Sequence, residues 1–288
     1  MTSAAATVAS WISRDGLNLS YRDHAGGAGR PPLICLHGLT RNSRDFEDFA
    51  ERHSGRFRVI APDFRGRGLS NRDPAPARYV PPTYAADTIE LLDALGVDEA
   101  VFVGTSLGGI VAMLIAAAQP KRVAGTILND VGPELSQAGL DRIRTYAGKP
   151  VRFAAWDEAA AYARDIARGM PASNGDQDWM RVARRLFREE GDGITLDYDM
   201  AIAQAFDPPP GEEQPHFDMW PLYRQLGCAP LLIVRGERSD LLSDEAADRM
   251  VQAVPGASLA TVPGVGHPPE LTEPAAAAAI DRFLARFG

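Results

Sequence analysis

The stretch VFVGTSLGGIVAMLIAA, residues 101–117, decides how this 288-residue chain is organised. A short apolar run is followed at once by GTSLGG and then by a helical stretch from Ile110 to Gln119. The segment 104–108 has the form G-x-S-x-G, which presents a reactive serine when it joins a strand to a helix. So sharp a turn strains its central residue and tolerates only small neighbours. Ser106 is therefore predicted to be a nucleophile; the alternative is a glycine-rich helix start with an unreactive serine.

Strands and helices alternate on both sides of this turn. Short apolar runs that end at turn-forming residues are typical of buried parallel strands. The expected strands are Leu17–Tyr21, Pro32–Leu36, Val59–Ala61, Val101–Val103, Val123–Leu128, Pro230–Val234 and Ser258–Val262. The expected helices between and after them are Thr83–Leu95, Ile110–Gln119, Ser243–Val254 and Pro274–Phe287. Such alternation predicts a parallel sheet with helices on both faces.

The alternation of strands and helices stops between residues 133 and 228, where helical patterns dominate and no strong strand candidate occurs. Trp179, Val182, Ala183, Leu186 and Phe187 share one helical face. Because strands resume after this segment, we predict one α/β core, residues 1–132 and 229–288, interrupted by a helical cap at 133–228.

A serine hydroxyl needs a base within hydrogen-bond reach to act as a nucleophile. Of the five histidines, His267 stands in the loop GVGHPPE between the last predicted strand and the last helix. Loops at the carboxyl ends of strands carry the functional residues of open α/β sheets. His267 is the predicted base; the alternative is a loop histidine bonded to backbone.

The imidazole in turn needs a carboxylate to set its tautomer and to stabilise its charged form. Asp240, in RGERSDLL, follows the penultimate predicted strand, and Asp130 follows the strand before it. We favour Asp240, because the chain order Ser, Asp, His with the acid after the penultimate strand is the usual one. Asp130 remains the alternative acid.

A tetrahedral intermediate also requires two backbone N–H donors. One is predicted to be Leu107, just after the nucleophile. The other is predicted to be Leu39, in the loop LHGLTRN, where Gly38 lets the chain turn. The alternative for this loop is an ordinary glycine turn.

The bulk composition excludes several classes of protein. The net charge of −8 argues against a nucleic-acid partner, which would need a clustered basic surface. Cys35 and Cys228 form no metal or redox pattern, and no metal or cofactor is expected. The N-terminus lacks signal-peptide features, and the longest apolar run, Leu107–Ala118, is too short to cross a membrane. We expect a cytoplasmic monomer or homodimer that acts on a small molecule and binds no membrane.

The motifs LHGLT, DFRGRGLS, GTSLGG, RGERSD and GVGHPPE together resemble those of the α/β-hydrolase family, across nearly the whole chain. The resemblance implies an eight-stranded, mostly parallel sheet and a triad of Ser106, Asp240 and His267. It implies a supporting role for Asp63 and Ser70 in DFRGRGLS. Relatives that dehalogenate alkanes or open epoxides carry aspartate where this chain has Ser106.

These residues predict hydrolysis of a carboxylic ester through an acyl-enzyme. Alternatives are hydrolysis of a carbon–carbon bond or a lactone, a cofactor-free perhydrolase, and a ligand receptor without catalysis. The substrate is expected to be small or medium-sized and largely apolar. Candidate substrate-binding residues are His37, Arg41 and the aromatic residues of the insertion, namely Phe153, Trp156, Trp179, Phe206, Phe217 and Trp220.

Overall fold

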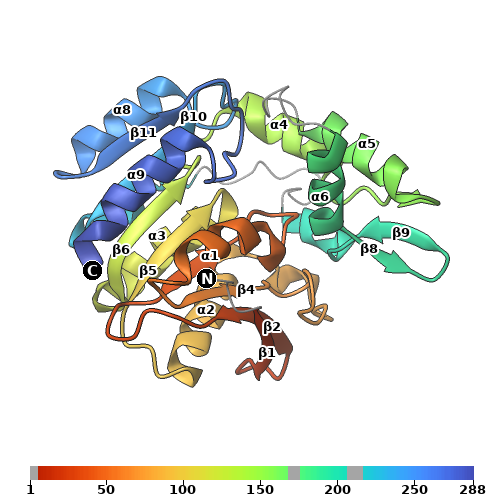
Figure 1. Cartoon of the computed structure of the whole chain (residues 1–288), viewed down its shortest axis with the longest axis horizontal. Coiled ribbons are helices and arrows are strands. Elements are labelled where there is room, and N and C mark those ends of the chain that lie inside the picture. Colours follow the sequence, from red (N-terminus) through yellow and green to blue (C-terminus); the bar gives the residue numbers. More distant parts are fainter. Residues whose placement is uncertain (1–5, 168–175, 206–216) are drawn as a thin grey trace.

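A computed structural model describes residues 6–167, 176–205 and 217–288 of the chain. At its centre is a sheet of eight strands in the order β1-β2-β4-β3-β5-β6-β10-β11 (Figure 1). The first two pairings, β1 with β2 and β2 with β4, are antiparallel, and the other strands run parallel. The prediction of a mostly parallel, eight-stranded sheet is confirmed. The strands are β1 Thr7–Ile12, β2 Asn18–His24, β3 Leu33–Leu36, β4 Val59–Pro62, β5 Ala100–Thr105, β6 Val123–Asn129, β10 Leu231–Gly236 and β11 Ser258–Val262.

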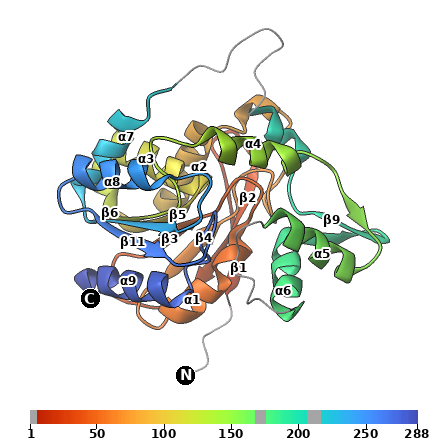
Figure 2. The ribbon, with the colours of Figure 1, turned by 90° about the horizontal axis from the view of Figure 1, so that it is seen from above.

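Helices cover both faces of this sheet, as the apolar strands require. One face packs against α1 and α9, and the other against α2, α3 and α8 (Figure 2). Residues of β3 and β5 are fully buried between the two layers, because neighbouring side chains point to opposite faces of a strand. The helices are α1 Glu47–His53, α2 Pro81–Ala94, α3 Leu107–Ala118, α8 Asp244–Ala253 and α9 Pro274–Leu284.

The segment between β6 and β10 projects from one side of the core (Figure 1). Its elements are α4 Gln137–Tyr146, β7 Arg152–Phe153, α5 Trp156–Ile166, α6 Asp176–Leu186, β8 Phe187–Glu190, β9 Gly193–Leu196 and α7 Trp220–Gln225. The last of these, α7, lies with the core helices (Figure 2), and Tyr223 donates a hydrogen bond of 2.8 Å to the carbonyl of Met250 in α8. Residues 168–175 and 206–216 of the predicted cap lie outside the described part of the chain.

The expectation that this segment holds no strands was wrong. It contains a three-stranded sheet in the order β7-β9-β8, with antiparallel pairing throughout. The strands were missed because they are two to four residues long and β8 reads FREE, without apolar alternation. The sequence did contain a hairpin signal, the stretch GDG at residues 191–193, and Gly191 adopts a φ of 63° in the turn between β8 and β9.

The inserted segment is tied to the core by polar contacts of α6. Asp48 of α1 accepts hydrogen bonds of 2.8 Å from both Arg181 and Arg185. The carbonyl of Arg185 accepts from the side chains of Asn42 and Arg44, at 2.7 and 2.9 Å. Across the described ranges, no helix is both long and apolar enough to cross a bilayer.

Candidate active site

Ser106 occupies the turn between β5 and α3, as the sequence predicted. It is the one residue between the two elements, with φ 51° and ψ −117°. This left-handed backbone is unfavourable for a residue with a side chain, and it is held by close packing around the turn. A Cβ on Gly108 would stand 2.0 Å from the carbonyl oxygen of Leu36, so α3 begins directly against β3. The turn thus depends on glycine at position 108.

His267 lies in the loop after β11 and lines the same cavity as Ser106. Its Nδ1 is 2.8 Å from Oδ2 of Asp130. Because an ionised carboxylate only accepts hydrogen bonds, Nδ1 carries the proton and Nε2 is left free to accept one. In the described part of the chain, no hydrogen bond joins the Ser106 hydroxyl to His267; such bonds are often loose in proteins without bound substrate.

Asp130 is fully buried at the end of β6, and both of its carboxylate oxygens are engaged. Oδ1 accepts a 3.0 Å hydrogen bond from the amide of Gly236, while Oδ2 faces His267. The backbone of Asp130 has a φ of 57°, a conformation that aspartate tolerates better than most residues. Its amide donates to the carbonyl of Val234 at 2.8 Å, so β10 holds the bend in place.

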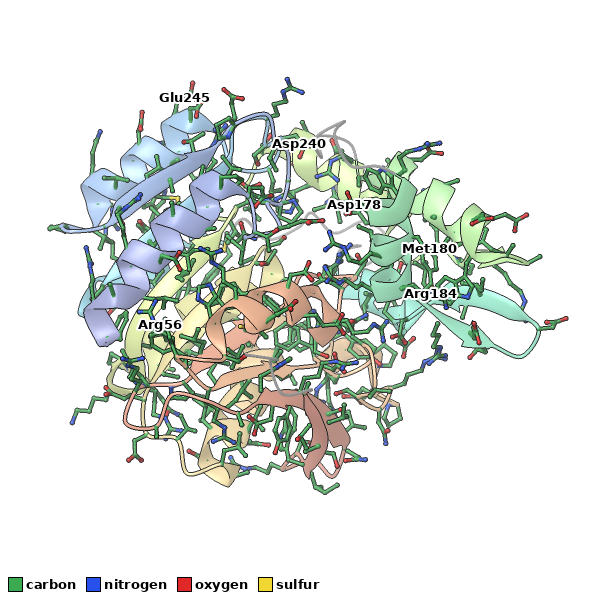
Figure 3. All side chains as sticks on the ribbon, viewed as in Figure 1. Arg56, Asp178, Met180, Arg184, Asp240 and Glu245 are labelled. Atoms are coloured by element: carbon green, nitrogen blue, oxygen red, sulfur yellow. The ribbon has the colours of Figure 1, made fainter. Side chains whose placement is uncertain are left out.

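The preference for Asp240 as the partner of His267 is therefore corrected. Asp240 lies four residues beyond the end of β10, beside α4 (Figure 3), and its carboxylate receives the Nε and Nη2 hydrogen bonds of Arg142. Partial burial opposes its ionisation, but the hydrogen bonds from Arg142 outweigh that effect and lower the pKa of Asp240. Asp130 is closer to His267 because it follows its strand directly, within the bend.

The predicted oxyanion donors lie on either side of Ser106. Leu107 is the first residue of α3, and Leu39 belongs to the loop after β3. A Cβ on Gly38 would stand 3.8 Å from Cβ of Ser106, so this loop passes close to the nucleophile. Neither amide donates to an acceptor within the described ranges. Both N–H groups are thus available to a ligand oxygen.

His37 does not line the cavity, contrary to the prediction that it binds substrate. It is fully buried, and burial lowers its pKa to about 3, so the ring is neutral. Nε2 accepts from the amide of Phe64 at 3.0 Å, and Nδ1 donates to the carbonyl of Gly38 at 2.7 Å. That carbonyl belongs to the same peptide group as the Leu39 amide. His37 therefore orients the loop and does not face the cavity.

Ser106 and His267 open into a cavity of about 140 Å³. Core and inserted segment both contribute to its walls. The apolar part is formed by Phe46, Ile143, Ala163, Ile166, Ala167, Val182, Leu186 and Leu271. The charged or polar part is formed by Arg41, Asp45, Arg142, Tyr146, Arg185 and Glu270.

None of the predicted tryptophans lines this cavity. Trp156 lies under the guanidinium of Arg184 and donates to Glu189 at 2.9 Å. Trp179 is buried in the apolar core of the segment, and Trp220 donates to Glu134 at 2.7 Å. Among the other aromatics, Phe153 packs on Tyr162 and Phe187, Phe217 is 67% exposed, and Phe206 lies outside the described residues.

Arg41, the remaining candidate for substrate binding, does line the cavity. The residues that the sequence reasoning missed are Arg142 and Tyr146 of α4, Arg185 of α6, and Glu270. Arg142 and Tyr146 are spaced i and i+4, which puts them on one helix face, but nothing in the sequence says which way that face points. Burial raises the pKa of Glu270, although the guanidinium of Arg181, 3.8 Å away, opposes the rise.

Comparison with known proteins agrees with this architecture. Residues 33–280 match the model of the alpha/beta hydrolase family. A solved alpha/beta hydrolase from Novosphingobium aromaticivorans is 44% identical and superimposes with a TM-score of 0.92, over 99% of each chain.

Two curated relatives are similar over most of their length. The 3-hydroxybutyrate-oligomer hydrolase of Cupriavidus necator is 34% identical over 280 residues, which are 95% of each chain. The 2-(acetamidomethylene)succinate hydrolase of Mesorhizobium japonicum is 31% identical over 253 residues, 87% of this chain and 85% of that one. With its sheet order, its strand-to-helix serine turn and this match over most of its length, the chain belongs to the alpha/beta hydrolase family.

Proposed function

We propose that this protein hydrolyses a carboxylic ester, with Ser106 as the nucleophile, His267 as the base and Asp130 as the acid that orients the base. The observation that carries the proposal is the 2.8 Å hydrogen bond between Asp130 and His267, on the cavity that Ser106 also lines. It leaves the Nε2 atom of His267 as the acceptor for the Ser106 proton.

The proposed reaction has two halves. The Oγ atom of Ser106 attacks the ester carbonyl while His267 takes its proton, and the amides of Leu39 and Leu107 donate to the developing oxyanion. His267 then protonates the leaving alcohol, and an acyl-enzyme remains. In the second half, His267 removes a proton from water as the water attacks the acyl group. The bond from the acyl carbon to Oγ then breaks, His267 returns the proton to Ser106, and the carboxylic acid leaves. Asp130 stabilises the charged imidazole in both halves.

The cavity and one relative support a small substrate of a particular kind. A cavity of about 140 Å³ favours a small substrate over a long-chain one. The 3-hydroxybutyrate-oligomer hydrolase acts, by its name, on an oligomer of a short hydroxy acid. We therefore propose an ester of a short hydroxy acid as the substrate, with the inserted segment 133–228 as the cap that selects it.

A second candidate is the hydrolysis of a different bond by the same residues. The similarity to 2-(acetamidomethylene)succinate hydrolase favours it. That relative is about as similar to this chain as the 3-hydroxybutyrate-oligomer hydrolase, but its name gives a different substrate. Carbon–carbon bonds and lactones belong to this candidate. A panel of short esters, lactones and β-diketones separates the two, and turnover of the ester panel alone supports our proposal.

Labelling with a fluorophosphonate tests the role of Ser106. We expect one equivalent of label on Ser106 by peptide mass spectrometry, and none on the Ser106→Ala protein. Ser136, which directly precedes α4, is a suitable control. We expect the Ser136→Ala protein to be labelled to the same extent as the unchanged protein. Equal labelling of Ser106→Ala would overturn the assignment.

A further inference from the structure

One wall of the cavity carries two arginines with a tyrosine close to both. Arg41 follows the loop after β3, while Arg142 and Tyr146 lie one turn apart on α4. The phenol of Tyr146 lies next to the guanidinium of Arg142 and within the field of Arg41. This arrangement, which we call the Arg41–Tyr146–Arg142 wall, plays no part in the proposed proton transfers.

Each arginine of the wall is held in place by its own carboxylate. Arg41 donates from Nε and Nη2 to Asp45, at 2.6 and 2.7 Å. Arg142 donates from the same two nitrogens to Asp240, with the Nη2 bond at 2.8 Å. In both pairs the carboxylate takes the Nε–Nη2 edge of the guanidinium. Arg142 is also hydrogen-bonded to the phenol of Tyr146, so the guanidinium and the phenol form one connected group of donors. A guanidinium fixed in this way is pre-organised, so little side-chain entropy is lost when it binds a ligand.

Tyr146 adds a neutral donor to these two cations. Burial raises the pKa of its hydroxyl, and the neighbouring arginines do not reverse that shift. The phenol therefore keeps its proton at neutral pH and donates to an anionic acceptor.

The wall is close to the reacting groups at both ends. Cγ of Arg41 would lie 3.4 Å from a Cβ on Gly38, in the loop that passes Ser106. At the other end, Asp240 holds Arg142 and is close enough to His267 for their charges to interact. A group bound here therefore shares one cavity with an ester carbonyl placed at Ser106.

Glu270 limits where an anion can bind in this cavity. Its carboxyl group lies within the fields of Arg181 and Arg185 of α6 and of Arg41. An anion is repelled there whenever Glu270 is ionised. The favourable position is therefore the α4 side, along Tyr146 and Arg142.

We propose that the Arg41–Tyr146–Arg142 wall binds the carboxylate of an acidic ester substrate, such as the free acid end of a hydroxy-acid dimer. This inference rests on the proposed function, because it names the substrate class of the same cavity. Asp45 and Asp240 balance the charge of the two arginines, so recognition comes from directed N–H and O–H donors. A neutral ester of the same size has no carboxylate to accept hydrogen bonds from these donors.

Binding to inactive protein tests the wall separately from catalysis. The Ser106→Ala protein is titrated by calorimetry with the linear dimer of 3-hydroxybutyrate and with the methyl ester of that dimer. Because hydrogen bonds to charged groups are strong, we expect the free acid to bind about 10- to 100-fold more tightly than its methyl ester. The preference should disappear in Arg142→Met/Asp240→Asn, which removes the ion pair without leaving Asp240 unpaired.

Matched variants keep the test decisive if that double variant folds poorly. Arg142→Lys retains the positive charge but loses the planar set of guanidinium donors. It should reduce the preference for the free acid over the methyl ester by several-fold. Arg152→Met/Asp192→Asn removes an exposed pair of the same type, at 2.6 Å, that does not line the cavity, and it should leave the preference unchanged.

Two outcomes overturn the inference: equal binding of acid and methyl ester, or a preference that survives in both Arg142 variants. Failure of the proposed function looks different. In that case Ser106 is not labelled by fluorophosphonate and the unaltered protein does not cleave the dimer, whatever calorimetry shows.

Discussion

The carboxylate of Asp130 lies 2.8 Å from Nδ1 of His267, although the two residues are 137 positions apart in the chain. They meet because β6 and β10 are neighbours in the sheet and the loop after β11 returns across their ends. Asp240, the other acid at this edge, is bound to Arg142. The two aspartates therefore have different partners, and mutation can separate their roles.

Asp130→Asn is predicted to lower kcat for a short ester by about 10³- to 10⁴-fold, because the amide cannot hold the imidazole in the productive tautomer. Asp240→Asn is predicted to lower kcat by less than tenfold, since it removes a charge near His267 but not its hydrogen-bond partner. Steady-state kinetics on a 4-nitrophenyl ester measures both. A larger loss in Asp240→Asn would restore Asp240 as the acid.

His37→Phe is predicted to lower kcat by about 10- to 100-fold with little change in KM, because the Leu39 peptide loses the bond that orients it. The phenyl ring keeps the contact with Phe64, whose centroid is 4.5 Å from that of His37. His53→Phe replaces another buried histidine, outside the cavity lining, and serves as the control with unchanged kcat. A rise in KM alone would instead indicate that His37 binds substrate.

Gly108→Ala is predicted to destabilise the fold by about 3 kcal/mol, because its Cβ would overlap the Leu36 carbonyl and the backbone must shift. Urea unfolding measures the change. Gly55→Ala is the matched control: nothing lies within 4 Å of a Cβ there, so its effect should stay within about 0.5 kcal/mol. Equal stabilities of the two variants would mean that α3 does not need its close approach to β3.

Asp48→Asn is predicted to raise KM about fivefold and to make KM less sensitive to salt. It removes the carboxylate that accepts from Arg181 and Arg185, and partly exposed ion pairs of this kind contribute about 1 kcal/mol or less each. KM is compared at low and high sodium chloride concentration. Asp281→Asn breaks the Arg52 pair between α1 and α9, away from α6, and should leave KM and its salt dependence as they are.

The buried histidines predict loss of stability in acid. Burial lowers the pKa of His53 to about 4, below the ordinary histidine value of about 6.5. Between these two values the unfolded chain binds a proton that the folded chain does not, so stability falls as the pH falls. From pH 7 to pH 5, His53 should account for about 2 kcal/mol of this loss. The free energy of unfolding of His53→Phe should therefore drop by that much less than that of the unchanged protein; equal drops would contradict the assignment.

Local patterns were sufficient to predict the alternating α/β core and the serine turn, but not β1 or the three short strands of the inserted segment. A buried strand, a glycine turn and a helix are consecutive in the sequence at Ser106, so no long-range information was needed. The acid was harder to predict, because Asp130 and Asp240 both follow strands at the same edge of the sheet. The choice depends on the φ of 57° at Asp130 and on the partner that Arg142 offers to Asp240. Neither can be deduced from residue spacing.

The cavity lining of the inserted segment was the least predictable part. Tryptophan suits an apolar pocket, a buried core and a surface stacked against arginine equally well, and Trp156 and Trp179 take the last two roles. Arg142 was missed because a charged residue on a helix is ordinarily assigned to the solvent. Its orientation follows from how α4 packs against the loop after β10, at Asp240 and Leu241, which is a property of the whole fold.

The position of Asp130 before the inserted segment has a consequence for protein engineering. Ser106, Asp130 and His267, with the amides of Leu39 and Leu107, all lie outside residues 133–228. A chimaera that receives this segment from a relative would keep all five proposed reaction groups on its own scaffold. Two core carboxylates would need redesign at the junction: Asp240, which would lose Arg142, and Asp48, which would lose Arg181 and Arg185. A segment from a relative is compatible when it places a positively charged residue at the position that Arg142 has in α4.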